Sequence, residues 1–499
     1  MQMHCSKPFH VICGIDGSVG EESVRVGRGA LWSVINSGLA QVLSLAAFFV
    51  TARFVSPSDF GVMAICLLIV ELFRQTAVEG IAIAVTAQEA PLPEDFNACF
   101  ISITLTSAAS ALLALALADV IAAFMANDQI GPALRLVSLL LLTTGLARTH
   151  EAWLTRQLQF RSLALRSVLS IAGGGGLGVV LAIRGYGLMA LIAQQLATAV
   201  IATVALWLAS SWRPSLRTNR ESFVKLWKSG RHISLTGLTN FVNTQSDTFF
   251  ASYYLGATAT GMYNAAKRIL LGANIVLVSA LNRVALPAFA NLRGDPERLS
   301  NAFLRATSIT STITAPVFFG LIVVAPDVVA VALGPRWVGA GSVLSLIAVT
   351  AYLTSLGQYN QSVLLVRDKA HWQTLLTAVY AITNVFLFLI VVRYGLEALA
   401  IGFTARAVLL YPLSAGAALF LLDLDARAYF RRVMPTVLAA GLMSAATWLF
   451  RMVIDVDHTL LRLILSVGFG AFAYISLLLV LARRDWRDAV FFARGLIGR

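Results

Sequence analysis

Apolar runs of about 20 residues alternate with short polar joints along almost the whole chain. Each run is long enough to cross the ~30 Å hydrocarbon layer of a bilayer as an α-helix. The pattern predicts about fourteen such helices and hence an all-α integral membrane protein. Their centres lie near Leu39, Leu68, Ser107, Leu140, Gly174, Ala197, Asn243, Val276, Thr312, Leu346, Thr383, Leu409, Ala440 and Phe472.

An internal repeat divides these predicted helices into two sets. The segment YGLMALIAQQLATAV at Tyr186 to Val200 returns as YGLEALAIGFTARAV at Tyr394 to Val408. Three further pairs of similar segments follow the same order, and they begin at Phe54 and Tyr254, Pro93 and Pro296, and Pro132 and Gly339. Ordered matches of this kind indicate an internal duplication.

Each copy holds six predicted helices, so both copies enter the membrane from the same side and form parallel repeats. Two such lobes around a central cleft are typical of an alternating-access transporter. The predicted parts are a flexible leader at 1–27, an N-lobe with the first six spans at 28–211, a basic linker at 212–230, a C-lobe with the next six at 231–424, a C-terminal helix pair at 425–484 and a basic tail at 485–499.

The composition agrees with a membrane protein. Hydrophobic residues make up 58% and charged residues 13% of the chain, against roughly 45–50% and 25% in soluble proteins. The net charge is +13, but the basic residues alternate from joint to joint and form no basic domain, which argues against a nucleic-acid partner. By the positive-inside rule both termini are expected in the cytoplasm, with the acidic joint at Gln88 to Asp95 as an exception.

Residue types that carry chemistry are sparse. The cysteines at 5, 13, 66 and 99 and the six histidines lack the spacing of a disulfide framework or a metal site. The glycine run from Gly173 to Gly176 is no phosphate loop, because a preceding strand and a following Lys-Ser/Thr are missing. We therefore expect neither a cofactor nor an enzyme, and coupling to H⁺ or Na⁺ stays open.

A resemblance to a known family rests on single residues scattered from Arg28 to about Arg484. They are Pro57, Asp59, Phe60, Gly61, Glu79, Gly80 and Gln88 in the first half, and Asp247, Leu255, Gly256, Gly261, Tyr263, Ala266, Arg268, Pro287, Pro316, Gly320, Gly334 and Trp337 in the second. This pattern resembles the polysaccharide flippase family, the Wzx-type and succinoglycan-transport branch of the multidrug/oligosaccharidyl-lipid/polysaccharide exporter superfamily. Glu79-Gly80 departs mildly from the family's usual Asp-Phe-Gly or Asp-Gly.

The resemblance implies a flippase that moves undecaprenyl-diphosphate-linked oligosaccharides across the bacterial inner membrane, for exopolysaccharide or lipopolysaccharide synthesis. Membrane lipid, a polysaccharide polymerase and a chain-length regulator are further expected partners. Three alternatives remain, of which one is a scaffold that transports nothing. A multidrug exporter of the same superfamily would use carboxylates to bind cations, whereas a membrane polysaccharide polymerase would need a large external loop, for which Ala325 to Ala340 is the longest candidate.

Basic side chains at membrane depth are the first candidates for substrate binding. A charge at the bilayer centre costs about 2.5 to 3.5 kcal/mol on insertion scales, so each needs a partner or water. Arg406 lies about ten residues into its span and either pairs with helix carbonyls or meets the lipid diphosphate. Lys267 and Arg268 lie one or two turns from the outer surface, where snorkelling to the interface is the alternative role. Arg451 and Arg462 are assigned to snorkelling.

The second predicted span carries Glu71, Arg74, Gln75 and Glu79 mostly on one helical face. Two interpretations are open. In one, Glu71 and Arg74 neutralise each other as an i,i+3 pair. In the other, the face lines a water path, Arg74 contacts the substrate anion, and Glu71 or Glu79 serves ion coupling.

The seventh predicted span carries a polar stripe at Thr236, Asn240, Asn243 and Asp247. Such a stripe does not face lipid. It either hydrogen-bonds to a neighbouring helix or lines a hydrated cleft that accepts sugar hydroxyls, together with a matching stripe in the first span. That matching stripe comprises Ser33, Ser37, Gln41 and Ser44. Asp247 is also a candidate for ion coupling.

Overall fold

The computed structural model describes residues 21–454 and 456–481. The basic tail predicted at 485–499 and the first twenty residues of the predicted leader lie outside this described part. The first described helix already begins at Glu21, within the predicted leader. The described chain divides into two compact units, which we call the first unit (Gly29–Ala265 with Thr377–Leu399) and the second unit (Glu21–Arg28, Ala266–Leu376 and the described residues from Ala400 onward).

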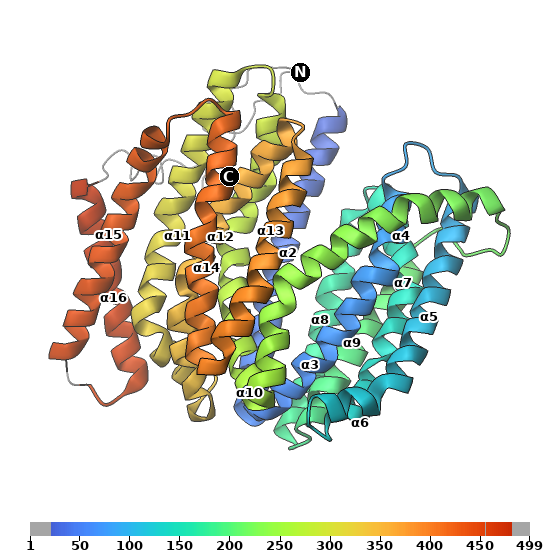
Figure 1. Cartoon of the computed structure of the whole chain (residues 1–499), viewed down its shortest axis with the longest axis horizontal. Coiled ribbons are helices and arrows are strands. Elements are labelled where there is room, and N and C mark those ends of the chain that lie inside the picture. Colours follow the sequence, from blue (N-terminus) through green and yellow to red (C-terminus); the bar gives the residue numbers. More distant parts are fainter. Residues whose placement is uncertain (1–20, 455, 482–499) are drawn as a thin grey trace. The chain divides into compact units, whose positions relative to one another are not determined.

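Helices build both units (Figure 1). The first unit contains most of α2 (Glu21–Phe54), then α3 (Pro57–Phe73), the π-helical turn η1 (Arg74–Val78), α4 (Glu79–Thr86), α5 (Pro93–Phe124), α6 (Ile130–Val137), α7 (Leu139–Arg156), α8 (Phe160–Ile183), α9 (Leu188–Ala209), the start of α10 (Arg220–Asn291), the end of α13 (Ala370–Val391), η3 (Val392–Tyr394) and the start of α14 (Leu396–Leu421). The second unit contains the remainder of α2, α10, α13 and α14, with α11 (Pro296–Ala332), η2 (Pro335–Trp337), α12 (Val338–Val366), α15 (Ala426–Val453) and α16 (Thr459–Leu481).

The predicted all-α membrane fold is confirmed. Within residues 21–454 and 456–481, eleven helical segments are long and apolar enough to span a bilayer. The three other predicted centres also fall in helices. Leu39 lies in α2, whose described apolar stretch Gly38–Phe54 is shorter, and Asn243 and Val276 both lie in α10. The number of fourteen spans and the internal repeat stay predictions.

Gly256 interrupts α10 between the two spans predicted there. Its φ of 77° and ψ of −178° break the helix, and this backbone conformation is open to glycine at little cost. The segments on either side fold back on each other, because the Tyr263 hydroxyl donates a hydrogen bond of 2.8 Å to the Asp247 carboxylate. Gly256 and Tyr263 thus both belong to this reversal of the chain.

Two glycines set the crossing of α3 and α10. A Cβ atom on Gly61 would lie 1.7 Å from the Ala257 carbonyl oxygen, and one on Gly261 would lie 1.8 Å from the Pro57 carbonyl oxygen. Small residues at such a crossing let two membrane helices approach backbone to backbone. The start of α3 is fixed as well, since Ser56 Oγ accepts from the Asp59 N–H at 3.1 Å and caps the helix.

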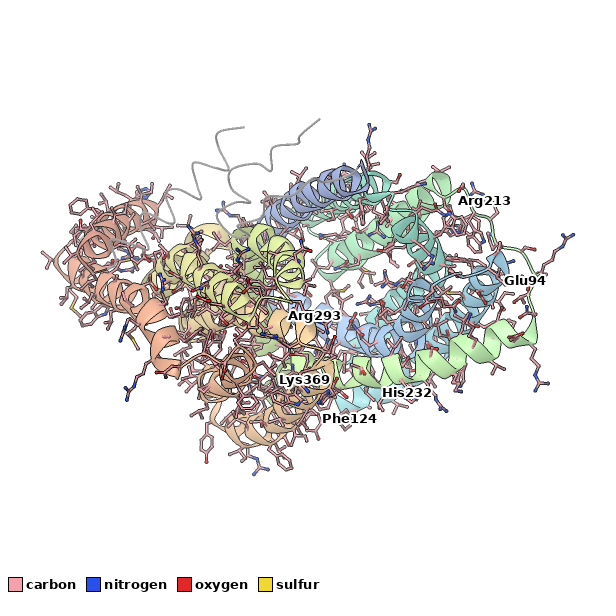
Figure 2. All side chains as sticks on the ribbon, turned by 90° about the horizontal axis from the view of Figure 1, so that it is seen from above. Glu94, Phe124, Arg213, His232, Arg293 and Lys369 are labelled. Carbon is pink, nitrogen blue, oxygen red and sulfur yellow. The ribbon has the colours of Figure 1, made fainter. Side chains whose placement is uncertain are left out.

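The linker after α9 is tied to the start of α5. Asn97 donates to the Arg217 carbonyl at 2.8 Å and accepts from the Ser215 N–H at 3.1 Å. Figure 2 labels Glu94 and Arg213 at this end of the first unit, and the Asn219 side chain donates to Glu94 at 2.6 Å. The start of α10 then lies across α4 and α5 (Figure 1), where Leu226 is buried in a cluster with residues such as Ile81 and Phe96.

The helices α15 and α16 lie beside α11 in the second unit, and a buried carboxylate joins all three (Figure 1). The Asp327 side chain of α11 is 3% exposed and pairs with Arg451 of α15 at 2.8 Å and Arg462 of α16 at 2.6 Å. The assignment of both arginines to snorkelling was therefore wrong: each reaches a carboxylate within the protein. The loop expected from Ala325 to Ala340 is also mostly helical, because α11 continues to Ala332 and α12 starts at Val338.

Replacing Asp327 with asparagine is expected to lower the free energy of unfolding by about 2–4 kcal/mol, because two partly buried guanidiniums lose their carboxylate. Thermal denaturation in detergent measures the effect. Asp119→Asn is the matched control, since its pair with Arg135 is exposed and such pairs contribute only about 0–1 kcal/mol. Equal shifts in the two variants would show that Asp327 does not hold the helix pair.

Candidate functional site

The acidic and basic residues of the second predicted span are paired with one another in the first unit. The Arg74 Nε and Nη2 atoms each lie 2.8 Å from a Glu71 carboxylate oxygen, and Arg74 Nη1 lies 2.5 Å from Glu79 Oε1. The Gln75 amide also donates to Glu71 at 2.7 Å. The predicted pairing of Glu71 with Arg74 is therefore present, and Glu79 completes it.

A π-helical turn makes the second of these pairs geometrically possible. Residues five apart on an α-helix are separated by roughly 140° around the axis, so Arg74 and Glu79 would face different sides of a regular helix. The turn η1, Arg74–Val78, is π-helical, and the wider turn aligns both side chains. Such π-bulges are often found at functional sites, although no sequence signal pointed to this one.

The ion pairs continue from Glu79 into α7 and α8. Glu79 Oε2 lies 2.5 Å from Arg148 Nη2, and Arg148 Nη1 lies 2.8 Å from Glu151. Arg166 on α8 contacts the same Glu151 carboxylate at 3.2 Å. We call the six residues the charge network: Glu71, Arg74, Glu79, Arg148, Glu151 and Arg166. Its three carboxylates balance its three guanidiniums, which favours a neutralised role for Arg74 over direct contact with an anion.

The sequence reasoning did not place three of these residues in a site. Arg148, Glu151 and Arg166 are not among the candidates that the sequence pattern indicated. The one available signal was the i,i+3 spacing of Arg148 and Glu151 on α7. The contact of Arg148 with Glu79 crosses 69 positions of sequence and carries no local signature.

In the second unit, two of the predicted substrate-binding cations share one aromatic ring. Lys267 Nζ lies 5.8 Å and Arg406 Cζ lies 5.3 Å from the centroid of the Phe403 ring, both within cation–π range. Phe403 and Arg406 are three residues apart on α14, so they share a face of the helix. Lys267 reaches the ring from α10. We call Lys267, Phe403 and Arg406 the cation cluster.

The cation cluster lies deep within its helices. Arg406 is about ten residues from the start of α14, which corresponds to ~15 Å along the axis. Lys267 is a similar distance from the helix break at Gly256. This distance is about half the thickness of a ~30 Å hydrocarbon layer, so neither cation lies at the end of its helical segment. Contact with Phe403 favours a role inside the protein for Lys267 over snorkelling. Arg268 follows it directly and is partly buried.

The polar stripe of the seventh predicted span divides into two parts. Thr236 and Asn240 are exposed, whereas Asn243 is partly buried and Asp247 is buried. The Asn384 amide of α13 donates to the Asn243 carbonyl at 2.6 Å and to its side chain at 3.0 Å. Asp247 accepts from Tyr263 and from the Thr248 N–H at 2.7 Å. Hydrogen bonds between helical segments thus account for Asn243 and Asp247, the buried part of the polar stripe.

The first-span stripe is described in part. Gln41 and Ser44 are partly buried on α2, and the side chains of Ser33 and Ser37 lie outside the described residues. In the part of the chain that the structure describes, His, Cys, Asp and Glu form no group of three or more that could hold a metal ion. Cys66 and Cys99 are buried and are not joined by a disulfide.

Comparison with known protein families identifies the family of this chain. Residues 50–342, more than half of the chain, match a family described as polysaccharide biosynthesis protein. The chain belongs to this family. The resemblance to a polysaccharide transport family is thereby confirmed.

Named relatives agree with the family. The chain is 28% identical over 325 residues to the succinoglycan biosynthesis transport protein ExoT of Rhizobium meliloti (strain 1021), an alignment that covers 65% of this chain and 66% of that protein. It is 24% identical over 382 residues to the lipopolysaccharide biosynthesis protein WzxC of Escherichia coli (strain K12), with 75% and 76% covered. By their names, the first is a transport protein of succinoglycan biosynthesis and the second a protein of lipopolysaccharide biosynthesis.

Solved structures show the same fold in transporters. The lipid II flippase MurJ in an inward closed conformation superposes with a TM-score of 0.75 at 14% identity, covering 91% of this chain and 99% of that chain. A multidrug resistance MATE family transporter of the MOP superfamily, in an inward-facing conformation, gives a TM-score of 0.58 at 18% identity, with 77% and 96% covered. This member of the polysaccharide biosynthesis protein family is therefore a multi-pass membrane protein with a transporter fold.

Proposed function

We propose that the protein is a flippase that moves undecaprenyl-diphosphate-linked oligosaccharide units across the bacterial inner membrane by alternating access. The observation that carries this proposal is the cation cluster, in which Lys267 and Arg406 contact one ring well inside their helices, in a family whose relatives include a named transport protein. Two fixed cations in that position suit an anionic group that has to cross the hydrocarbon layer. The polymer served is an exopolysaccharide or a lipopolysaccharide.

The chemistry of the cation cluster suits a diphosphate. The Arg406 guanidinium never deprotonates and holds phosphate oxygens in a two-pronged fork, and the Lys267 ammonium adds a mobile point charge. The Phe403 ring attracts both cations through its face. Arg268, next to Lys267, is a further candidate contact for the substrate anion.

The remaining predicted residues complete the proposal. Exposed hydroxyl and amide groups of Thr236 and Asn240, with Asn243 and Gln41, would accept the sugar hydroxyls. Driving force is available from the membrane potential: two negative charges moving outward across an inside-negative ~100 mV release about 4.6 kcal/mol, at about 2.3 kcal/mol per charge. Candidates for additional H⁺ or Na⁺ coupling are the carboxylates of Glu71, Glu79 and Asp247.

In this proposal the protein performs no covalent chemistry and needs no cofactor. Both termini lie in the cytoplasm, the lipid tail of the substrate stays in the bilayer, and a polysaccharide polymerase with its chain-length regulator acts on the translocated units. The charge network of the first unit would serve in the alternation between states, because its ion pairs join α7 and α8 to the second predicted span.

Deletion of the gene is expected to stop export of the polymer and to make lipid-linked oligosaccharides accumulate. Extraction of these lipids from the deletion strain and quantification by mass spectrometry measures the effect. A second candidate function, multidrug export, is favoured by the likeness to the MATE transporter. It predicts the opposite pattern, namely higher susceptibility to cationic drugs with unchanged lipid-linked oligosaccharides.

A further inference from the structure

The opening turns of α10 carry an apolar face that the first unit leaves uncovered. Leu226 is buried among residues of α4 and α5. By contrast, Val224 is 57% exposed, and Trp227 and Leu235 are each 64% exposed. Positions 224, 227 and 235 recur at helical spacing and lie on one side of α10. Exposed apolar residues beside lysine and arginine are typical of a helix that lies in the membrane interface.

A cavity of about 590 Å³ adjoins this face, within the first unit alone. It is lined by Ile81, Ser102, Phe223, Val224, Leu226, Trp227, Lys228 and Arg231. Ile81 is about five residues from the end of α4 and Ser102 about nine from the start of α5. The cavity thus reaches roughly 8–14 Å below the helix ends, the depth at which lipid headgroups give way to acyl chains.

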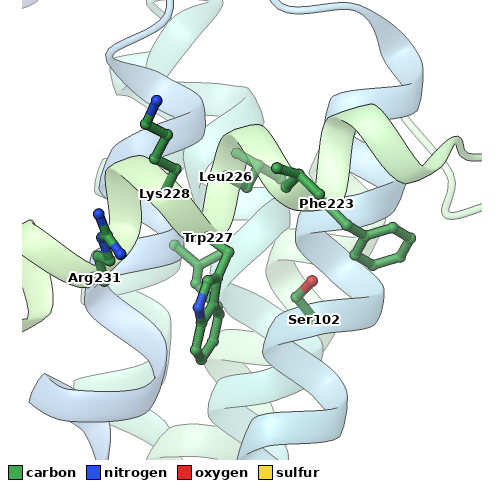
Figure 3. A pocket seen from close by; sticks show the side chains of 8 residues that line it. Ser102, Phe223, Leu226, Trp227, Lys228 and Arg231 are labelled. Atoms are coloured by element: carbon green, nitrogen blue, oxygen red, sulfur yellow. The ribbon is translucent and has the colours of Figure 1, made fainter.

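Figure 3 shows how the side chains divide around the cavity. The Trp227 indole extends from α10 on the same side as Ser102, whereas the Lys228 chain extends to the opposite side of α10. The lining is therefore apolar toward the helices α4 and α5 and basic at its rim, where Lys228 and Arg231 are exposed. This is the arrangement that an amphiphile with an anionic headgroup requires.

We propose that this cavity binds one anionic phospholipid of the leaflet that the start of α10 faces. An acyl chain lies against Phe223 and Trp227, and the lipid phosphate lies between Lys228 and Arg231. Charge complementarity selects the occupant: the segment from 213 to 231 carries one acid, Glu221, and six basic residues, which are Arg213, Arg217, Arg220, Lys225, Lys228 and Arg231. A zwitterionic lipid has no net charge and gains less from such a surface.

The inference is independent of the proposed function. None of the cavity residues belongs to the cation cluster, and the cavity needs no translocated sugar. A lipid bound there would hold the start of α10 at the bilayer surface, because its headgroup and its chain contact neighbouring side chains of the same helix.

Quenching of Trp227 fluorescence tests the proposal. The full chain is placed in phosphatidylcholine vesicles with a minority of phosphatidylglycerol, and bromine is carried on the acyl chains of one lipid or the other. The signal of Trp227 is the difference between wild type and Trp227→Phe. Brominated phosphatidylglycerol is expected to quench this signal more strongly, mole for mole, than brominated phosphatidylcholine.

Two charge-matched variants locate the effect. Lys228→Gln with Arg231→Gln is expected to weaken the apparent affinity for phosphatidylglycerol about tenfold. Arg220→Gln with Lys225→Gln removes the same charge from exposed positions of α10 that do not line the cavity, and it should keep the preference. Equal quenching by the two lipids, or equal loss in both double variants, would overturn a specific site and leave only general attraction to an anionic surface.

Discussion

Replacement of both Lys267 and Arg406 with alanine is expected to abolish export of the polysaccharide, while the protein remains in the membrane. Hydrogen bonds to a charged group contribute about 1.5–3 kcal/mol each, so loss of both cations weakens the hold on a diphosphate by about 10²–10⁴-fold. Either single variant should retain partial export, because the second cation still contacts the Phe403 ring. Complementation of a deletion strain, with exported polymer and membrane-inserted protein both quantified, measures the effect.

Two controls separate this role from a general loss of positive charge. Arg135→Ala removes an arginine whose pair with Asp119 is half-exposed, and export should stay near wild type. Arg406→Lys keeps the charge but loses the planar fork, so an intermediate result is expected. Full export by the double alanine variant would exclude the cation cluster from substrate binding.

Replacement of Glu79 with glutamine should destabilise the first unit by about 3 kcal/mol and lower export together with it. The Glu79 side chain is 10% exposed and pairs with both Arg74 and Arg148 at 2.5 Å. In the variant both guanidiniums lose this carboxylate, and partly buried positive charge is left without compensation at that position. Thermal denaturation of the purified protein measures the loss. Glu94→Gln is the matched control, because this acid is exposed at the start of α5.

A second substitution distinguishes the ion pair from other effects of the first. If Glu79 acts by neutralising Arg148, the double variant Glu79→Gln with Arg148→Gln should be more stable than Glu79→Gln alone, since the surplus charge is removed with its partner. Strictly additive losses would contradict the coupling between these two residues.

The fold class could be predicted from local sequence, because an apolar run of about 20 residues is long enough to span a bilayer and is visible without any knowledge of tertiary contacts. The break of α10 at Gly256 was not predicted, because a glycine by itself does not show that its residue adopts a positive φ. The course of α10 was less accessible. Its start is basic and short of long apolar runs, so the sequence indicated a linker, while burial of Leu226 against the first unit depends on tertiary packing.

In the candidate site, too, local sequence predicted single residues and near neighbours but not contacts between distant helices. Depth along a span singled out Arg406, and helical spacing paired Glu71 with Arg74. The partners from distant helices stayed hidden, because Lys267 meets Phe403 and Asp327 meets Arg462 across more than a hundred positions. The sequence therefore identified charged residues whose burial in a membrane costs free energy. The ion pairs that neutralise some of them, such as Asp327 with Arg462, become visible only in the packed helices.

The most direct test of the account is the initial rate at which the purified protein moves undecaprenyl-diphosphate-linked oligosaccharide across the bilayer of a proteoliposome. The account predicts a rate well above that of protein-free liposomes, an increase when a potential favours outward movement of negative charge, and a return to the background rate when Lys267 and Arg406 are both replaced by alanine. A wild-type rate equal to that of protein-free liposomes would contradict it.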